Sequence, residues 1–95
     1  MVTSNEPGLY REGMHGIRHE NVLLCREAGE SGFGEWLDFE TLTCCHIDTS
    51  AVVPELLGPE AVRWLNAYNE RVYRTLSPLL PPHTAAWLRE KTMPV

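Results

Sequence analysis

The spacing of apolar residues changes once along this 95-residue chain, and this change constrains the fold more than any other feature. From Met1 to about Asp48, apolar and polar residues alternate in runs that Gly and Pro interrupt, which is typical of β-strands. From Pro59 onward, apolar residues recur at steps of three and four, which indicates helix. Residues 49–58 connect the two zones. We therefore predict an α+β fold in which antiparallel β-strands are followed by two C-terminal helices.

Three strands are predicted in the first zone. The first begins at Val2 and ends at the turn 6–8, because Pro fixes φ and Gly accepts positive φ. The second is a continuous strand from Ile17 to Cys25, and the third runs from Trp36 to about Ile47. The stretch from Glu27 to Glu35 contains three glycines, and we predict a loop there.

The predicted long helix has clear start and stop signals. It begins at Pro59, where Pro at the first helical position is favourable, and it ends before Pro78. A shorter second helix is expected from Thr84 to Lys91. The apolar stripe of the long helix consists of Ala61, Trp64, Leu65, Tyr68, Val72 and Leu76.

Charge and cysteine content exclude several classes of function. The net charge of -5, with eight scattered basic residues, argues against a nucleic-acid partner or an anionic membrane surface. No apolar run approaches the roughly 20 residues that a membrane span needs. The odd set of three cysteines includes the adjacent pair Cys44 and Cys45, which makes a poor disulfide, so free thiols in the cytoplasm are predicted. A zinc site at Cys44-Cys45-His46 is not expected, because three adjacent residues cannot all turn toward one ion.

Two acids have unusual local settings. Glu6 lies beside the Pro-Gly turn, and Glu20 shares a face of the predicted second strand with apolar Val22. They are either a solvated turn acid and an ion-paired strand acid, or two carboxylates that converge on divalent metal, which prefers such hard oxygen ligands. Arg18 shares the strand face of Glu20, where it is either an ordinary surface cation or a group that orients a carboxylate.

The segments around these acids resemble the paired "NEPG" and "GIRIEN" segments of the aminopeptidase P family. The resemblance covers practically the whole chain through residues 4–8, 16–21, 39–43, 47–48, 64–68, 87–88 and 92–95. One departure is His19, where the family usually has an aliphatic residue. By alternation His19 points away from Glu20, so we expect it to pack or face solvent rather than bind metal.

The resemblance implies that the chain is a C-terminal fragment of the pita-bread fold. Residues 1–48 would end the catalytic domain with its metal-ligand strands, and residues 49–95 would form the helical C-terminal extension. The family removes the N-terminal residue from peptides with proline second, using two divalent ions, commonly manganese or zinc. Of its five metal ligands, two correspond to Glu6 and Glu20, with Glu20 bridging both ions. Glu6 would also transfer a proton. For Arg18, the strand alternation and not the resemblance suggests the role of orienting a carboxylate.

The predicted function is therefore the C-terminal part of a cytoplasmic Xaa-Pro aminopeptidase with a two-metal site. The remaining ligands, two Asp and one His, would lie upstream of Met1, so the isolated chain should be inactive. Alternatively, the chain is a non-catalytic remnant that acts as an oligomerisation or interaction module, or a separate chain supplies the missing half. A homo-oligomer is expected, with Trp64, Tyr68 and Trp87 at the contact surface.

Overall fold

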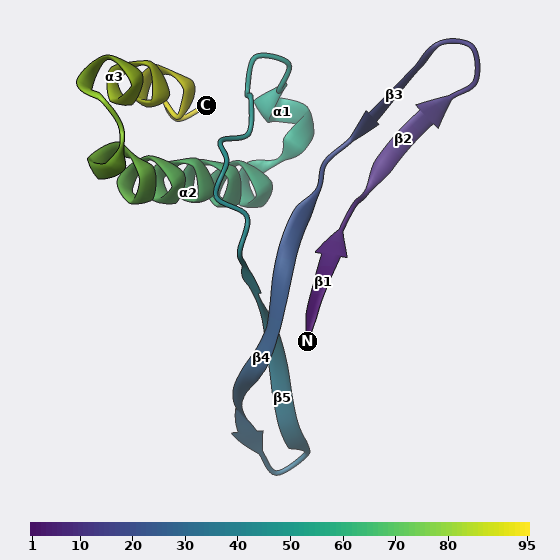
Figure 1. The fold of residues 1–95 in the computed structure, drawn as a ribbon. Helices are drawn as coiled ribbons and strands as arrows, with labels where there is room; N and C mark the ends of the chain where they lie inside the picture. Colours follow the sequence, from purple (N-terminus) through teal and green to yellow (C-terminus); the bar gives the residue numbers. More distant parts are fainter. The chain divides into compact units, whose positions relative to one another are not determined.

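The computed structural model describes residues 1–95, which divide by packing into two units, Met1–Thr43 and Cys44–Val95 (Figure 1). The first unit holds all the strands and the second holds all the helices. The predicted α+β class, with antiparallel strands followed by helices, is confirmed. None of these helices combines the length and the apolar character that crossing a membrane requires.

The strand unit consists of two antiparallel sheets. One is three-stranded in the order β1-β4-β5, and the other is the β2-β3 hairpin. The strands are β1 Val2–Asn5, β2 Gly8–Arg11, β3 His15–Arg18, β4 Asn21–Ser31 and β5 Gly34–Thr41.

The predicted continuous strand from Ile17 to Cys25 is wrong, because the chain leaves strand geometry at His19 and Glu20. The physical reason lies opposite, at Pro7, which has no N–H to give to a strand ladder. Pairing there is reduced to one bond, in which the His19 N–H donates to the Pro7 carbonyl oxygen (3.1 Å). The sequence reading also missed the β2-β3 hairpin, whose turn contains Gly13 at φ 68°.

The predicted loop from Glu27 to Glu35 is also wrong. Strand β4 continues to Ser31, and a two-residue turn joins it to β5, which starts at Gly34. The glycines mark local irregularities instead of a loop: the register shifts between Glu27 and Gly29, and Gly29 adopts φ 126°, as a β-bulge permits. At its other end β5 stops at Thr41, short of the predicted Ile47.

The helical unit contains the predicted long helix with its predicted ends. Its elements are α1 Pro54–Leu57, α2 Pro59–Leu76, the 3-10 helix η1 Ser77–Leu79 and α3 Pro82–Lys91. Helix α1 lies in the stretch that was predicted to be only a connector, and α3 begins two residues before the predicted Thr84. Gly58 links α1 to α2 at φ 86°, a conformation that L side chains rarely adopt.

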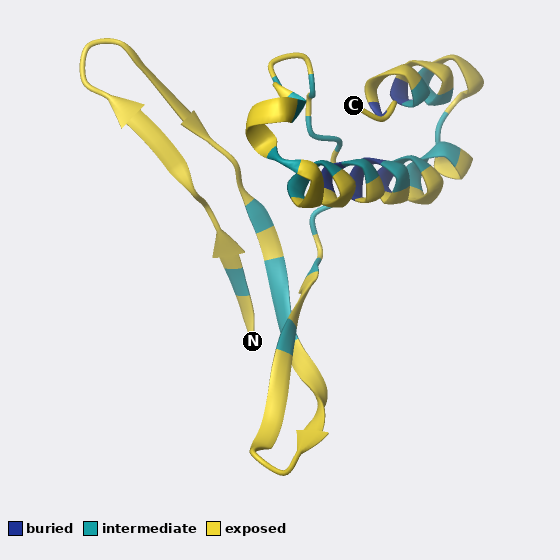
Figure 2. Ribbon diagram, turned by 180° about the vertical axis from the view of Figure 1, so that it is seen from behind, coloured by how far each residue is buried: buried dark blue, intermediate teal, exposed yellow.

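Every buried side chain belongs to the helical unit, mostly on α2 (Figure 2). The six buried residues are Leu65, Tyr68, Asn69, Val72, Leu88 and Thr92. Three members of the predicted stripe are therefore buried, but Trp64 is 51% exposed and stacks on Tyr68, with 5.3 Å between ring centroids. The burial of Asn69 is not predicted from the sequence. Its side-chain amide accepts a hydrogen bond from the Ile47 N–H (2.9 Å) and donates one to the Ile47 carbonyl oxygen (3.0 Å).

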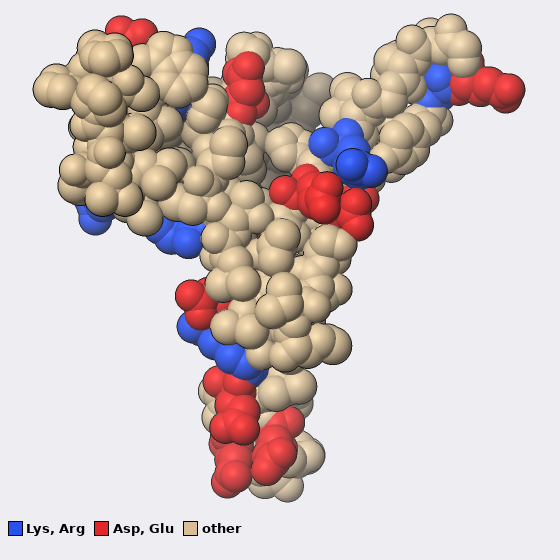
Figure 3. Space-filling view, viewed as in Figure 1, with Lys and Arg blue, Asp and Glu red and all other residues tan.

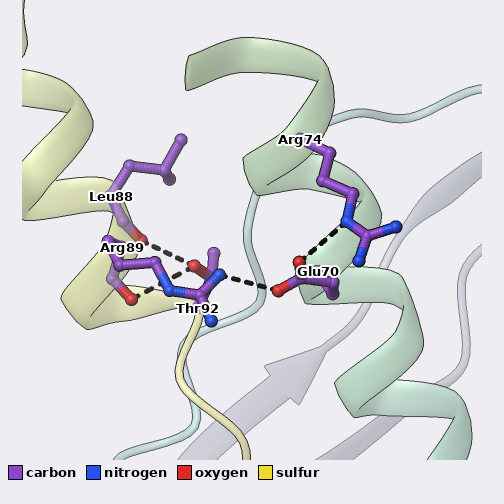
Figure 4. Close-up of polar contacts among 5 residues, drawn as sticks. All are labelled: Glu70, Arg74, Leu88, Arg89 and Thr92. Carbon is purple, nitrogen blue, oxygen red and sulfur yellow. Dashed lines mark hydrogen bonds and ion pairs between the residues drawn. The ribbon is translucent and has the colours of Figure 1, made fainter.

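Ion pairs centred on Glu70 join α2 to α3 (Figure 4). One oxygen of Glu70 accepts from Arg89 Nη1 (2.7 Å), and the other accepts from Arg74 Nε (2.9 Å). The Arg89 guanidinium also lies 4.6 Å from the centre of the Tyr73 ring. Hydrogen bonds from Arg89 and Arg74 hold the pKa of Glu70 below its usual value.

This lowered pKa predicts an acid-dependent loss of stability in the helical unit. A carboxyl whose pKa is lower in the folded state stabilises the fold above its unfolded pKa of about 4.3, and that contribution disappears as pH falls through the folded pKa. The urea concentration at the midpoint of unfolding should fall between pH 7 and pH 3, and this fall should be smaller in Glu70→Gln than in the wild type. The control is Glu90→Gln, an exposed acid on α3. Equal falls in the wild type and Glu70→Gln would contradict the prediction.

Candidate functional site

Strand register places the two candidate acids directly opposite each other. Asn5 pairs with Asn21, and beyond the interruption Gly8 pairs with Arg18 without a shift in register. Glu6 and Glu20 lie in this interruption, each next to the last ladder pair of β1 and β4. Glu6 and Glu20 therefore face each other in a short gap between the two ladders, where neither residue belongs to a strand.

Arg18 contacts both carboxylates. Its Nη1 atom lies 3.8 Å from Glu6 Oε1, and its Nη2 atom lies 3.5 Å from Glu20 Oε2. The contact with Glu20 was expected from alternation along a continuous strand, whereas Arg18 here ends β3 and Glu20 follows it outside the strand. Ser4 adds a contact that the sequence reading missed, because its hydroxyl donates to Glu6 Oε2 at 2.7 Å.

The chemistry of this donor set fits part of a divalent-metal site. Two like charges in opposed positions repel each other, and the side chains of Glu6 and Glu20 are 42% and 45% exposed. Arg18 compensates for part of that repulsion, and a divalent cation between hard carboxylate oxygens would do so more strongly. The chain nowhere groups three or more His, Cys, Asp or Glu side chains that could hold a metal ion. The two carboxylates are therefore an incomplete donor set.

The neighbouring aromatic residue explains two glycines. A Cβ atom added to Gly8 would lie 2.8 Å from the Tyr10 ring, and one added to Gly16 would lie 2.7 Å from it. The ring therefore lies against Gly8 of β2 and Gly16 of β3, and a larger residue at either position would force the Tyr10 side chain to move. The sequence patterns did not single out Tyr10, which pairs with Gly16 across the hairpin and lies two residues after Gly8.

Other polar side chains make contacts of their own or face solvent. The side chain of His19 is exposed, and the His46 ring packs edge-on against Trp87, with 5.3 Å between centroids. Acidic side chains also gather toward the turn of the β4-β5 hairpin (Figure 3). Arg26 pairs there with Asp38 at 2.7 Å, which holds the pKa of Asp38 below its usual value.

Comparison with known proteins relates this chain to peptidases. The family model for the C-terminal region of peptidase M24 matches residues 35–95. A probable Xaa-Pro aminopeptidase P from Coprinopsis cinerea is 38% identical over 100 residues, and aminopeptidase P2 from Arabidopsis thaliana is 41% identical over 99 residues. Both similarities cover 100% of this chain.

A solved structure has the same fold over nearly the whole chain. X-prolyl aminopeptidase from Caenorhabditis elegans, described as a cytosolic enzyme with a di-nuclear active site, superposes with a TM-score of 0.84 at 35% identity. The similarity covers 99% of this chain but 16% of the C. elegans protein. The chain likewise spans 16% of the length of the Coprinopsis relative and 14% of the Arabidopsis relative.

Proposed function

This chain belongs to the peptidase M24 family, where it corresponds to the C-terminal region of the Xaa-Pro aminopeptidases, and on this premise we propose that it completes the two-metal site of such an enzyme. The single observation that carries the proposal is the opposition of Glu6 and Glu20 around Arg18, at the segments that resemble the family's metal-ligand strands. The whole protein would release the N-terminal residue from cytoplasmic peptides with proline second.

In this proposal Glu6 and Glu20 would be two of the carboxylates that hold two divalent ions, manganese or zinc, and Glu20 would be the ligand that the two ions share. The chemistry that the ions supply when bound is the activation of a water nucleophile and the stabilisation of charge on the scissile carbonyl. A carboxylate oxygen of Glu6 accepts the proton of the attacking water and passes it to the leaving nitrogen. Arg18 would orient the two carboxylates, since its guanidinium nitrogens lie 3.8 Å from Glu6 Oε1 and 3.5 Å from Glu20 Oε2. Two Asp and one His from elsewhere in the protein would complete the ligand set.

The proposal predicts a sharp difference between the isolated chain and the full-length protein. The full-length protein should hydrolyse an Xaa-Pro-Xaa peptide, lose activity with a chelator and regain it with manganese. Residues 1–95 alone should show no hydrolysis at any manganese concentration, because two carboxylates cannot hold two ions in register. Release of the N-terminal residue by the isolated chain, or by the chelated full-length protein, would contradict the proposal.

We also propose that residues 1–48 end the catalytic domain and that residues 49–95 form its C-terminal extension. A second proposal is that the protein forms a homo-oligomer. Trp64 and Trp87, which are 51% and 48% exposed, support a contact surface on the helices. The prediction that Tyr68 belongs to that surface is wrong. Tyr68 is 5% exposed, and its hydroxyl donates to the Cys45 carbonyl oxygen. The alternative of a stand-alone interaction module draws support from the strands, where Trp36 and Phe39 are more than half exposed.

A further inference from the structure

Glu6 is held by a contact that the proposed ligand set does not include. The Ser4 hydroxyl donates to Glu6 Oε2 at 2.7 Å, while Arg18 approaches the other oxygen, Oε1, at 3.8 Å. A 2.7 Å O–H···O⁻ distance is that of a charge-assisted hydrogen bond, whereas 3.8 Å is an ion pair without a hydrogen bond. The directional contact of Glu6 is therefore the one with Ser4.

The strand ladder makes Ser4 a firm anchor. Ser4 lies in β1 opposite Val22 of β4, so its backbone position is set by the sheet. Glu6 lies two residues further on, outside the strand and before Pro7, where no ladder bond restrains it. Side chains of residues i and i+2 in an extended segment point to the same side, which brings the Ser4 hydroxyl next to the Glu6 carboxylate. Glu20 has no such hydroxyl contact and pairs only with Arg18.

We infer that Ser4 is a positioning residue for metal binding, whose hydroxyl fixes the rotamer of Glu6 so that the carboxylate presents its free lone pairs to the ions. The inference rests on the proposed function, because it assigns Ser4 a role toward that same site. Groups that hydrogen-bond a metal-ligating carboxylate orient it and tune its affinity. The bond contributes little to folding, because both partners are exposed, so loss of metal affinity is separable from loss of fold.

The test measures Mn²⁺ binding to the metal-stripped full-length protein by calorimetry. Ser4→Ala should weaken binding of Mn²⁺ by about 10- to 100-fold, the usual cost of losing such a contact. Ser4→Thr should restore wild-type affinity, because it keeps the hydroxyl. Ser4→Cys, which keeps the size with only a weak donor, should behave like Ser4→Ala and serves if the alanine variant misfolds.

The matched control is Thr3→Val on the same strand, whose hydroxyl contacts the Ser4 carbonyl oxygen at 3.5 Å and not Glu6. It should bind Mn²⁺ as the wild type does. Wild-type affinity in both Ser4→Ala and Ser4→Cys, together with weakened binding in Glu6→Gln, would overturn the role of Ser4 and leave the proposed function standing. If the wild type binds no Mn²⁺, or if Glu6→Gln binds it normally, the proposed function fails and the role of Ser4 fails with it.

Discussion

Glu20→Gln in the full-length protein is expected to abolish metal-dependent hydrolysis of an Xaa-Pro-Xaa peptide. The amide is nearly isosteric with the carboxylate, but it removes the negative charge that would join two cations. Losing a contact to a metal ligand already costs up to about 100-fold, so losing a ligand shared by two ions should reduce kcat/KM by more than about 100-fold. The fold should be retained, because Glu20 is half-exposed and its only ion pair is with Arg18 at 3.5 Å.

The matched control is Glu12→Gln, an exposed acid in the turn of the β2-β3 hairpin. It carries the same change of charge a few residues from the site and should leave kcat/KM unchanged. Circular dichroism and bound-metal analysis on both variants separate loss of ligation from loss of fold. Wild-type turnover of Glu20→Gln at saturating manganese would show that Glu20 does not bridge the ions.

The helices could be predicted from the sequence because their signals are local. Pro59 starts α2, and Pro78 lies just beyond Ser77, which follows the last residue of α2, so both ends are predicted correctly. Strand pairing depends on residues that are far apart in the sequence, so local patterns predicted the strand boundaries incorrectly. The break at His19 is caused by Pro7 across the ladder. Gly29 lies at a bulge within β4 and not in a loop, because pairing with β5 overrides its loop propensity.

The candidate site could be predicted in part. The motif resemblance singled out Glu6 and Glu20, and the structure brings both against Arg18, although through ladder register and not through one strand face. Ser4 was missed because a hydroxyl two residues from an acid is common in any sequence. In the helical unit a signal was present for Asn69, which lies four residues after Leu65 and three before Val72, on the apolar stripe.

Asn69→Leu is expected to destabilise the helical unit by about 2 kcal/mol, although it replaces a polar residue with an apolar one of similar size. Asn69 is 1% exposed, and its amide satisfies both the N–H and the C=O of Ile47. Leaving a buried backbone group unpaired costs about 1–3 kcal/mol, and Ile47 is only partly buried, so the combined cost stays below the sum. Thermal unfolding followed at the helical circular dichroism band should show a Tm lower by roughly 10 °C.

Asn66→Leu on the same helix separates this effect from any general response of α2 to leucine. Asn66 makes the same two-bond contact with the backbone of Val95, at 3.0 and 3.2 Å, but in an exposed setting where water can replace it. Its loss should therefore cost less than about 0.5 kcal/mol. Hydrogen exchange supplies an independent readout, because only Asn69→Leu should remove protection from the Ile47 amide. Equal Tm values for the two variants would mean that the Ile47 groups find other partners and that burial, not the Asn69 amide, holds this segment on α2.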